Sequence, residues 1–315
     1  MPSASAGETV GFVGLGEMGL RMCEALLDAG HALAVHDARE EPMRELETRG
    51  ATRCASPAEV ADRAETVLVS LPRPEIVREV ACGGDGLLHG KAIRAYVDLS
   101  TTGAAVAEQV AATLGEAGVK CLDAPVSGGV AGVLARRLTV MTSGEAELDA
   151  RVRPLLETFA GKVLWVGPSP GQGQTAKLLN NLLSATAMAV TSEAMTFAVS
   201  AGLDPQTLLE IFNSSSGQNT ATRDKFPTHV LTRRFEAGFR LELMAKDVEL
   251  CLAEARSRRT PMFVGAVVQQ LWSLAASAAE PDDDHTRIVE LYERWGDVVV
   301  AERSDAHAGG SSAHV

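Results

Sequence analysis

The sequence has few aromatic residues, few cysteines and fewer basic than acidic residues. Aromatic residues make up 4% of the 315 residues, and the five scattered cysteines include no C-x-x-C pair. This spacing argues against a disulfide framework or a zinc cluster and indicates buried thiols in a reducing compartment. With 29 basic against 41 acidic residues, the net charge of −12 repels nucleic acid and anionic membrane surfaces. We expect neither as a partner and no metal, whereas local amides still allow a small acidic metabolite.

Two kinds of membrane-directed segment are also missing. Residues 1–8 are short and polar, without the basic and then apolar stretch of a signal peptide. The apolar run at 178–201 is interrupted by Asn180, Asn181, Ser184 and Glu193, which is too often for a membrane span. We therefore expect a buried helix there, in a cytoplasmic protein.

The first half of the chain alternates short apolar runs with helical patterns, which is typical of repeated βαβ units. Ser56-Pro57 has the form of a helix start, with a capping residue followed by proline. The pattern predicts a Rossmann-type, doubly wound parallel sheet of the α/β class. Its expected strands are 9–13, 32–37, 66–70, 95–99, 120–124, 138–142 and 163–166.

The character of the sequence changes at residues 167–173, which read GPSPGQG, and nearly everything after them has helical periodicity. We expect an NAD(P)-binding Rossmann domain at 1–169 and an all-α substrate and dimerisation domain at 170–302, joined by a long interdomain helix. The polar tail at 303–315 is expected to be disordered. The expected helices of the second half are 174–201, 205–213, 241–256, 261–279 and 285–295.

A glycine motif lies where the first strand should meet the first helix. Gly14, Gly16 and Gly19 enclose Leu15, Glu17 and Met18 in the pattern G-x-G-x-x-G. In this strand-to-helix context the glycines permit a tight turn, close approach of a pyrophosphate and close helix packing. Amides at the helix start meet the phosphate charge. We expect a dinucleotide here, with the alternative that the glycines serve only a turn.

An acidic residue at the end of the second expected strand bears on the choice of dinucleotide. Asp37 lies 18 residues beyond Gly19, where a carboxylate accepts hydrogen bonds from the ribose hydroxyls of NAD. The same carboxylate would repel the 2′-phosphate of NADP. Arg39 could pair with that phosphate, or could be an ordinary solvated arginine. NAD is the expected cofactor, with NADP as the alternative.

Four ordered blocks give the chain a resemblance to the β-hydroxyacid dehydrogenase family, which includes 3-hydroxyisobutyrate dehydrogenase and tartronate semialdehyde reductase. The blocks span nearly the whole chain and are GFVGLGEMG at 11–19, DAPVSGG at 123–129, GQTAKLLNN at 173–181, and Lys246-Asp247. The resemblance implies hydride transfer between a nicotinamide cofactor and a small β-hydroxyacid or its semialdehyde.

The resemblance also implies roles for individual residues. Lys177 would be the catalytic proton donor and acceptor, and Asn181 would position the substrate oxygen or carboxylate. Ser127, Gly128 and Gly129 would hold the substrate acid group, and the implied cofactor contacts are Leu71, Pro72, Thr101 and Lys246. From the residues alone other readings stay open: a bare turn at 127–129, a structural lysine with an amide pair at 177–181, and a solvated Lys246 pairing with Glu242 or Glu249.

The chain departs from the family in two places. It reads Ser100-Thr101-Thr102-Gly103-Ala104 where many relatives have Ser-Thr-Ile and then a proline, and Arg136-Arg137-Leu138 where Gly-Thr-Leu is usual. These departures leave the substrate and the physiological direction open. The segment 214–223 is expected to contribute side-chain specificity, and Arg223 could meet a second acidic group or be a surface arginine.

Rival functions are an imine or other carbonyl reductase on the same fold, and a noncatalytic NAD(P)-binding interaction protein. Lys177 argues against an imine reductase, and its retention counts against the noncatalytic protein. The apolar length of the helix at 174–201 exceeds what a small helical domain covers, so a homodimer or homotetramer is expected.

Overall fold

The computed structural model describes residues 8–302, and these fold into two compact units. The sheet unit contains the described residues up to Asn180 together with Ala253–Pro261. The helical unit contains Asn181–Leu252 and the described residues from Met262 onward. The expected disordered tail at 303–315 lies outside the described residues.

The sheet unit is built on one sheet, in the order β3-β2-β1-β4-β5-β6-β8-β7, with β9 paired to β8. The first six strands in this order are parallel, which is the doubly wound arrangement that the alternating sequence pattern predicts. β8 then pairs antiparallel with both β6 and β7 and parallel with β9. The strands are β1 (Thr9–Val13), β2 (Ala32–His36), β3 (Thr52–Arg53), β4 (Thr66–Val69), β5 (Ala95–Asp98), β6 (Lys120–Asp123), β7 (Val126–Ser127), β8 (Leu138–Gly144) and β9 (Ala160–Gly167).

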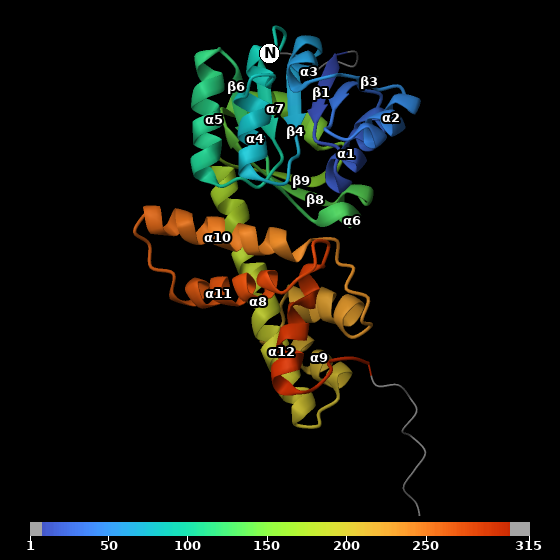
Figure 1. Ribbon diagram of the computed structural model, residues 1–315, viewed down its shortest axis with the longest axis vertical. Coiled ribbons are helices and arrows are strands. Elements are labelled where there is room, and N and C mark those ends of the chain that lie inside the picture. Colours follow the sequence, from blue (N-terminus) through green and yellow to red (C-terminus); the bar gives the residue numbers. More distant parts are fainter. Residues whose placement is uncertain (1–7, 303–315) are drawn as a thin grey trace, which may run out of the picture. The chain divides into compact units, whose positions relative to one another are not determined.

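Helices cover both faces of this sheet (Figure 1). One apolar core joins the sheet to α1, α2, α6 and α7, and a second joins its other face to α3, α4, η1 and α5. The Ser56-Pro57 helix start is confirmed, because the Ser56 side chain accepts a hydrogen bond from the Glu59 amide. The helices are α1 (Glu17–Asp28), α2 (Glu40–Thr48), α3 (Pro57–Arg63), α4 (Pro74–Cys82), η1 (Leu87–His89), α5 (Ala104–Glu116), α6 (Gly129–Leu134) and α7 (Ala146–Leu156).

The longest helix is α8 (Gln172–Ser200), which begins in the sheet unit and continues into the helical unit. It is long and apolar enough to cross a membrane by length and composition alone, but half of its most apolar window is buried in the protein. Ala185 lies near the middle of α8, and its carbonyl oxygen accepts a hydrogen bond at 3.2 Å from Nε1 of the buried Trp272. These are the features of a core helix in a soluble fold.

The helical unit has no described β-strand and packs its other helices with most of α8. These are α9 (Pro205–Asn213), η2 (Ala221–Val230), α10 (Leu241–Ser257), α11 (Phe263–Ser277), η3 (His285–Arg287) and α12 (Ile288–Gly296). The whole of η2 is π-helix, and it contains Pro227. The all-α character of this half was predicted, but the π-helix was not, because its sequence lacks a clear 3.6-residue period.

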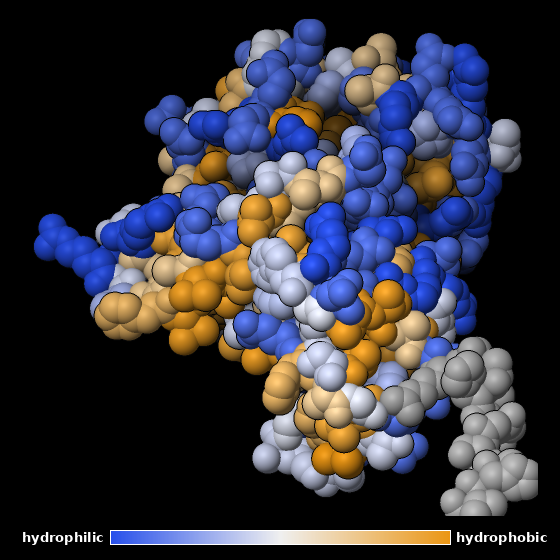
Figure 2. Space-filling view, turned by 60° about the horizontal axis from the view of Figure 1, so that its bottom comes forward, coloured by the Kyte–Doolittle hydropathy of each residue, from blue (hydrophilic) through white to orange (hydrophobic). Residues whose placement is uncertain are grey.

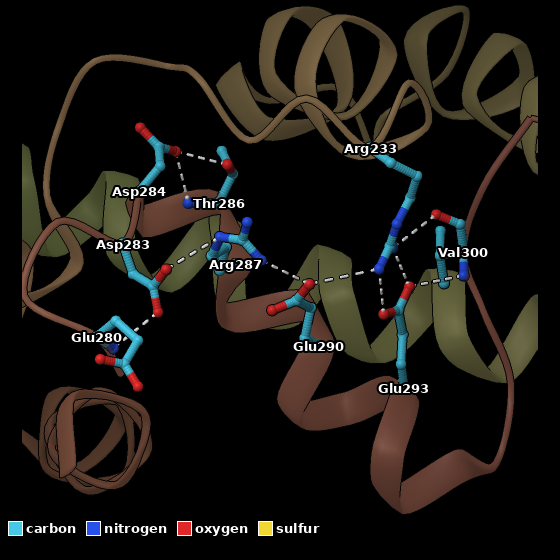
Figure 3. Close-up of polar contacts among 9 residues, drawn as sticks. All are labelled: Arg233, Glu280, Asp283, Asp284, Thr286, Arg287, Glu290, Glu293 and Val300. Carbon is cyan, nitrogen blue, oxygen red and sulfur yellow. Dashed lines mark hydrogen bonds and ion pairs between the residues drawn. The ribbon is translucent and has the colours of Figure 1, made fainter. Parts of the chain in front are cut away.

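A network of ion pairs ties α12 to the turn that follows η2 (Figure 3). Arg233 binds the Glu293 carboxylate through both guanidinium nitrogens, at 2.5 and 3.1 Å, and reaches Glu290 at 3.5 Å. Arg287 bridges Glu290 at 2.9 Å and Asp283 at 3.1 Å. Because the Glu293 side chain is only 7% exposed, its charge depends on Arg233.

The described residues contain free thiols and no candidate metal cluster. None of the five cysteines forms a disulfide, although Cys82 and Cys121 are only partly buried rather than fully buried as expected. Within residues 8–302, no group of three or more histidine, cysteine or acidic side chains could hold a metal ion.

Candidate active site

The glycine motif forms the turn between β1 and α1, and two of its glycines are required by packing. Gly14 has φ +94°, and a Cβ there would lie 2.3 Å from the carbonyl oxygen of Ser70 at the end of β4. A Cβ on Gly19 would lie 1.9 Å from the carbonyl oxygen of Gly14. Neither position can carry a side chain without moving backbone.

Gly16 differs from its two neighbours in the motif. Nothing lies within 4 Å of where its Cβ would be, and no side chain of the described residues caps the α1 N-terminus that it begins. Glu17 is exposed and Met18 half-buried in the same first turn. Uncapped helix amides beside open space suit a pyrophosphate, so these residues fit the dinucleotide that the motif predicts.

Asp37 follows β2 directly and lies against the glycine turn. Its carboxylate accepts a hydrogen bond from the Leu15 amide at 2.6 Å and from the Arg39 amide at 2.8 Å. The Arg39 guanidinium contacts Asp37 at 3.2 Å and the Leu15 carbonyl at 3.0 Å, so this arginine is folded back onto the motif. A cleft of about 550 Å³ opens beside Asp37 at the ends of β2 and β3.

The turns after β4 and β5 are fastened to each other. The Leu71 amide donates to Ser100 Oγ at 2.9 Å, and the Ser100 amide donates to Asp98 Oδ1 at 2.9 Å. Pro72 is exposed and Thr101 half-buried in these turns. Burial raises the pKa of the Asp98 carboxyl to about 7, against the lowering effect of its hydrogen bonds with Ser100.

The turn after β7 offers backbone rather than side chains. Gly128 and Gly129 have φ +133° and +62°, conformations that favour glycine, and Gly128 is exposed. Ser127 precedes them half-buried at the end of β7. Consecutive backbone amides in a turn of this kind can form a concave anion site.

The start of α8 is anchored to the sheet edge by Asp123, the last residue of β6. Asp123 Oδ2 accepts hydrogen bonds from the Gly171 amide and from Ser143 Oγ at 2.7 Å, and Ser143 Oγ accepts from the Gly173 amide at 2.8 Å. Burial raises the pKa of Asp123 to about 6, opposed by the hydrogen bond from Ser143. Lys177, on the second turn of this anchored helix, is 7% exposed.

The remaining predicted site residues belong to the helical unit and contact one another there. Asn181 Nδ2 donates to Asp247 Oδ2 at 2.6 Å, and Lys246 Nζ lies 3.0 Å from Asp247 Oδ1. Asp247 is 1% exposed, so it fixes the side chains of both Asn181 and Lys246.

Several residues differ from the sequence interpretation or were missed by it. Arg223 is largely exposed and pairs with its neighbour Asp224, as a surface arginine does. Arg136 has φ +51°, so its position favours the glycine that is usual in relatives. Lys225 was not singled out, yet it donates to Ser184 Oγ at 2.8 Å and burial lowers its pKa to about 8. Gln174 was also missed, since its partners lie more than 70 residues away.

Most predicted site residues thus lie at one edge of the sheet unit. The glycine turn, Asp37, Leu71, Thr101 and the Ser127–Gly129 turn all follow the carboxyl ends of strands, where ligands of open α/β sheets bind. Lys177 is held at the same edge through the start of α8. Asn181 and Lys246 lie in the other unit.

Comparisons with known proteins agree with this fold and with a nicotinamide cofactor. Residues 9–167 match the model of the NAD binding domain of 6-phosphogluconate dehydrogenase. Residues 171–292 match the model described as NAD-binding of NADP-dependent 3-hydroxyisobutyrate dehydrogenase.

Individual relatives are similar over most of their length. The 3-hydroxyisobutyrate dehydrogenase of Pseudomonas aeruginosa is 37% identical over 294 residues, which are 90% of this chain and 98% of that protein. The L-threonate dehydrogenase of Cupriavidus necator is 30% identical, over 90% of this chain and 95% of that protein. The structure of Mycobacterium tuberculosis 3-hydroxyisobutyrate dehydrogenase with L-serine superposes with a TM-score of 0.82 at 30% identity, over 90% and 98% of the two chains.

Proposed function

The chain belongs to the β-hydroxyacid dehydrogenase family, and from that premise we propose that it uses Lys177 to move a proton while hydride passes between a small β-hydroxyacid, or its semialdehyde, and the cofactor. Nicotinamide-dependent oxidoreduction of a hydroxyacid is common to the relatives. The finer assignment concerns which residues act and on which acid.

One observation carries the proposal: a lysine is buried on a helix whose start is bonded to the ligand-binding edge of the sheet. Lys177 lies on α8 four residues beyond Gly173, whose amide is held by Ser143. Burial keeps water away from the ammonium group, and a rigid support limits its movement. Both features suit a proton donor and acceptor.

The cofactor fits the glycine turn. Gly16 has the space and α1 the uncapped amides for the pyrophosphate, with Glu17 and Met18 in the same turn. Asp37 would accept hydrogen bonds from the ribose hydroxyls, which favours NAD. NADP is the alternative because the Arg39 guanidinium, 3.2 Å from the Asp37 carboxylate, could pair with the 2′-phosphate. Leu71, Pro72 and Thr101 would line the cofactor. When bound, the nicotinamide ring supplies or takes up the hydride.

The residues of this chain would carry out the rest of the reaction. The Ser127–Gly129 turn would hold the substrate carboxylate through its amides and the serine hydroxyl. During alcohol oxidation Lys177 Nζ accepts the hydroxyl proton, and during aldehyde reduction its ammonium returns a proton to the same oxygen. By family resemblance, Asn181 would orient the substrate and Lys246 would contact the cofactor, each fixed by Asp247.

The test is a reduction assay with NAD and NADP across 3-hydroxyisobutyrate, D-glycerate, 4-hydroxybutyrate, L-serine and L-threonate. We expect the wild type to oxidise at least one acid, and Lys177→Ala to lose about 10²- to 10⁴-fold in kcat. Lys177→Arg keeps the charge but cannot give up its proton, so it should also be inactive. Cofactor binding and circular dichroism check that the variants are folded. Full activity in Lys177→Ala would refute the lysine mechanism, and cofactor binding without activity on any acid would favour another carbonyl or imine substrate.

We also propose that the active form is a homodimer or homotetramer in the cytoplasm, with a second copy of the chain covering the exposed apolar side chains of the helical unit. Leu183, Val190 and Phe197 recur every seven residues on α8 and are 72%, 52% and 75% exposed. Phe263 on α11 is 84% exposed. Figure 2 shows apolar surface gathered in patches rather than scattered singly. Light scattering of wild type and Phe197→Glu tests this: the variant should dissociate, and a monomeric wild type would contradict the proposal.

A further inference from the structure

Gln174 is fully buried, and both the oxygen and the nitrogen of its side-chain amide form hydrogen bonds. It lies in the first turn of α8 with 0% of its surface exposed. Its Oε1 accepts hydrogen bonds from the amides of Thr102 at 2.9 Å and Gly103 at 3.4 Å, and its Nε2 donates to the carbonyl oxygen of Ser100 at 3.0 Å. One side chain therefore bonds to the backbone of Ser100, Thr102 and Gly103, which flank Thr101 on both sides.

The segment that Gln174 holds is the turn after β5, which contains Thr101. Ser100 extends the connection, since its hydroxyl accepts from the Leu71 amide in the turn after β4. The two turns proposed to line the cofactor are thus bonded to each other and, through Gln174, to the helix of Lys177. All these residues belong to the sheet unit.

A second anchor holds α8 but does not reach this turn. Asp123 and Ser143 bind the amides of Gly171 and Gly173 and connect the helix start to β6 and β8. That anchor sets where the helix begins. Of the hydrogen bonds described for these side chains, those of Gln174 join the helix start to residues 100–103.

We propose that Gln174 is a positioning residue for the reaction: it sets the distance between the cofactor-lining turn at Thr101 and Lys177, three residues along the same helix. This inference rests on the proposed function. The hydride is exchanged with the substrate carbon and the proton with the oxygen bonded to that carbon. The nicotinamide ring and Lys177 must therefore both be in position at the same C–O group. An error of about 1 Å in such an arrangement costs up to about 10²-fold in rate. Gln174 touches neither reacting atom and acts through Thr101 and Lys177.

The chain offers a matched control two residues earlier. Gln172 is also in the first turn of α8 but is exposed, and its Oε1 accepts a local hydrogen bond from the Ser169 amide at 3.1 Å. Gln174→Met keeps side-chain length and removes all three hydrogen bonds. We expect it to lower kcat about 10- to 100-fold with little change in the KM for cofactor, whereas Gln172→Met stays within about two-fold. A purely structural role predicts lower stability with normal kcat per folded molecule, which would overturn the proposal.

A second variant keeps the proposal testable if Gln174→Met folds poorly. Gln174→Glu is nearly isosteric, and its neutral carboxyl can still accept from Thr102 and donate to the Ser100 carbonyl. The ionised carboxylate instead faces that carbonyl oxygen and repels it. The kcat of this variant relative to wild type should therefore recover as pH falls. A constant deficit across pH would contradict the positioning role.

One readout does not depend on substrate, so the two proposals can fail separately. The fluorescence of bound NADH reports the environment of the nicotinamide ring. Gln174→Met should bind NADH with a Kd within about three-fold of wild type but change its bound fluorescence, because the cofactor-lining turn has moved. Unchanged fluorescence overturns the inference even if no acid is oxidised. A normal kcat in Gln174→Met beside an inactive Lys177→Ala refutes the inference and leaves the proposed function intact.

Discussion

The two units hold their buried polar groups by different means. At the ligand-binding edge of the sheet unit, the amide of Gln174 and the hydroxyls of Ser100 and Ser143 bond to backbone and to carboxyls whose pKa burial raises. In the helical unit, Arg233 and Arg287 form ion pairs with three carboxylates, those of Asp283, Glu290 and Glu293, and stack on Phe235 at 4.6 and 4.7 Å. The carboxyls of Asp98 and Asp123 at the sheet edge are held by amides and hydroxyls, whereas the ion pairs of the helical unit join α12 to nearby turns where no ligand is proposed. The comparison teaches that these two clusters of buried polar groups are held by different chemistry: hydrogen bonds from amides and hydroxyls at the sheet edge, and ion pairs around Arg233 and Arg287.

The largest effect should come from breaking the ionic network. Arg233→Met leaves the buried Glu293 without its bidentate partner, so the helical unit should lose about 3 kcal/mol of stability. Urea unfolding followed by tryptophan fluorescence measures this, since two of the three tryptophans, Trp272 and Trp295, lie in that unit. The kcat per folded molecule should be unchanged.

The matched control is Arg223→Met, which breaks an ion pair whose two side chains are more than half exposed. It should change stability by less than about 0.5 kcal/mol. If the two substitutions cost the same, the Arg233 network does not stabilise the helical unit through burial.

A second prediction uses pH, which should affect the two units in opposite directions. Burial raises the pKa of Asp98 from 3.8 to about 7, so folding favours its protonated form and the sheet unit loses stability as pH rises from about 4 through 7. Asp98→Asn keeps an acceptor for the Ser100 amide and cannot ionise. It should flatten this decline and raise stability at pH 8 by on the order of 2 kcal/mol, measured by urea unfolding at several pH values.

Asp284 in the helical unit provides the opposite case. Burial alone would raise the pKa of Asp284. Hydrogen bonds from His285 and Thr286, together with the charge of His285, instead hold this pKa well below its usual range. Its contribution is present above the usual aspartate pKa and is lost as pH falls, so Asp284→Asn should destabilise at pH 7 more than at pH 3. If the change in unfolding free energy varied with pH in the same direction for Asp98→Asn and Asp284→Asn, the two units would not differ in how their buried carboxyls respond to pH.

The smallest effect concerns the ion pair that the sheet unit keeps at its cofactor turn. Arg39 is 64% exposed and contacts Asp37, so Arg39→Ala should alter stability by less than about 0.5 kcal/mol. If charge in this unit serves the ligand, the variant should bind NADPH about ten-fold more weakly while NADH binding stays nearly constant. Fluorescence titration with both cofactors measures this. An equal loss for both would mean that Arg39 supports the turn rather than the 2′-phosphate.

Much of the sheet unit could be predicted from sequence because its signals are local. The strand Thr9–Val13, the glycine turn and the next strand follow from periodicity and glycine spacing within about 30 residues. The parallel sheet and the helical second half were confirmed in the same way. The two-residue strands β3 and β7 are too short to leave a pattern, and the antiparallel placement of β8 depends on partners elsewhere in the chain.

The site was predictable where residues act through their own segment and not where they act at a distance. Family motifs pointed to Lys177, the Ser127–Gly129 turn and Lys246, whose roles stay predictions. Gln174 lies inside one of those motifs, yet its function follows only from partners 71 to 74 residues away. From sequence alone, Arg136 suggests a change in the chemistry of the site. Its φ of +51° shows that replacing glycine here affects the backbone conformation instead.

The glycine turn bears on how such motifs should be interpreted in other chains. A side chain at Gly14 is excluded by the carbonyl oxygen of Ser70, and one at Gly19 by the carbonyl oxygen of Gly14, so a descendant that stopped binding a dinucleotide would still be under selection to keep both glycines. Gly16 has no such neighbour, and in such a descendant it would be free to drift. Of the three glycines, the middle one therefore carries the information about ligand binding, and the outer two report mainly on the fold.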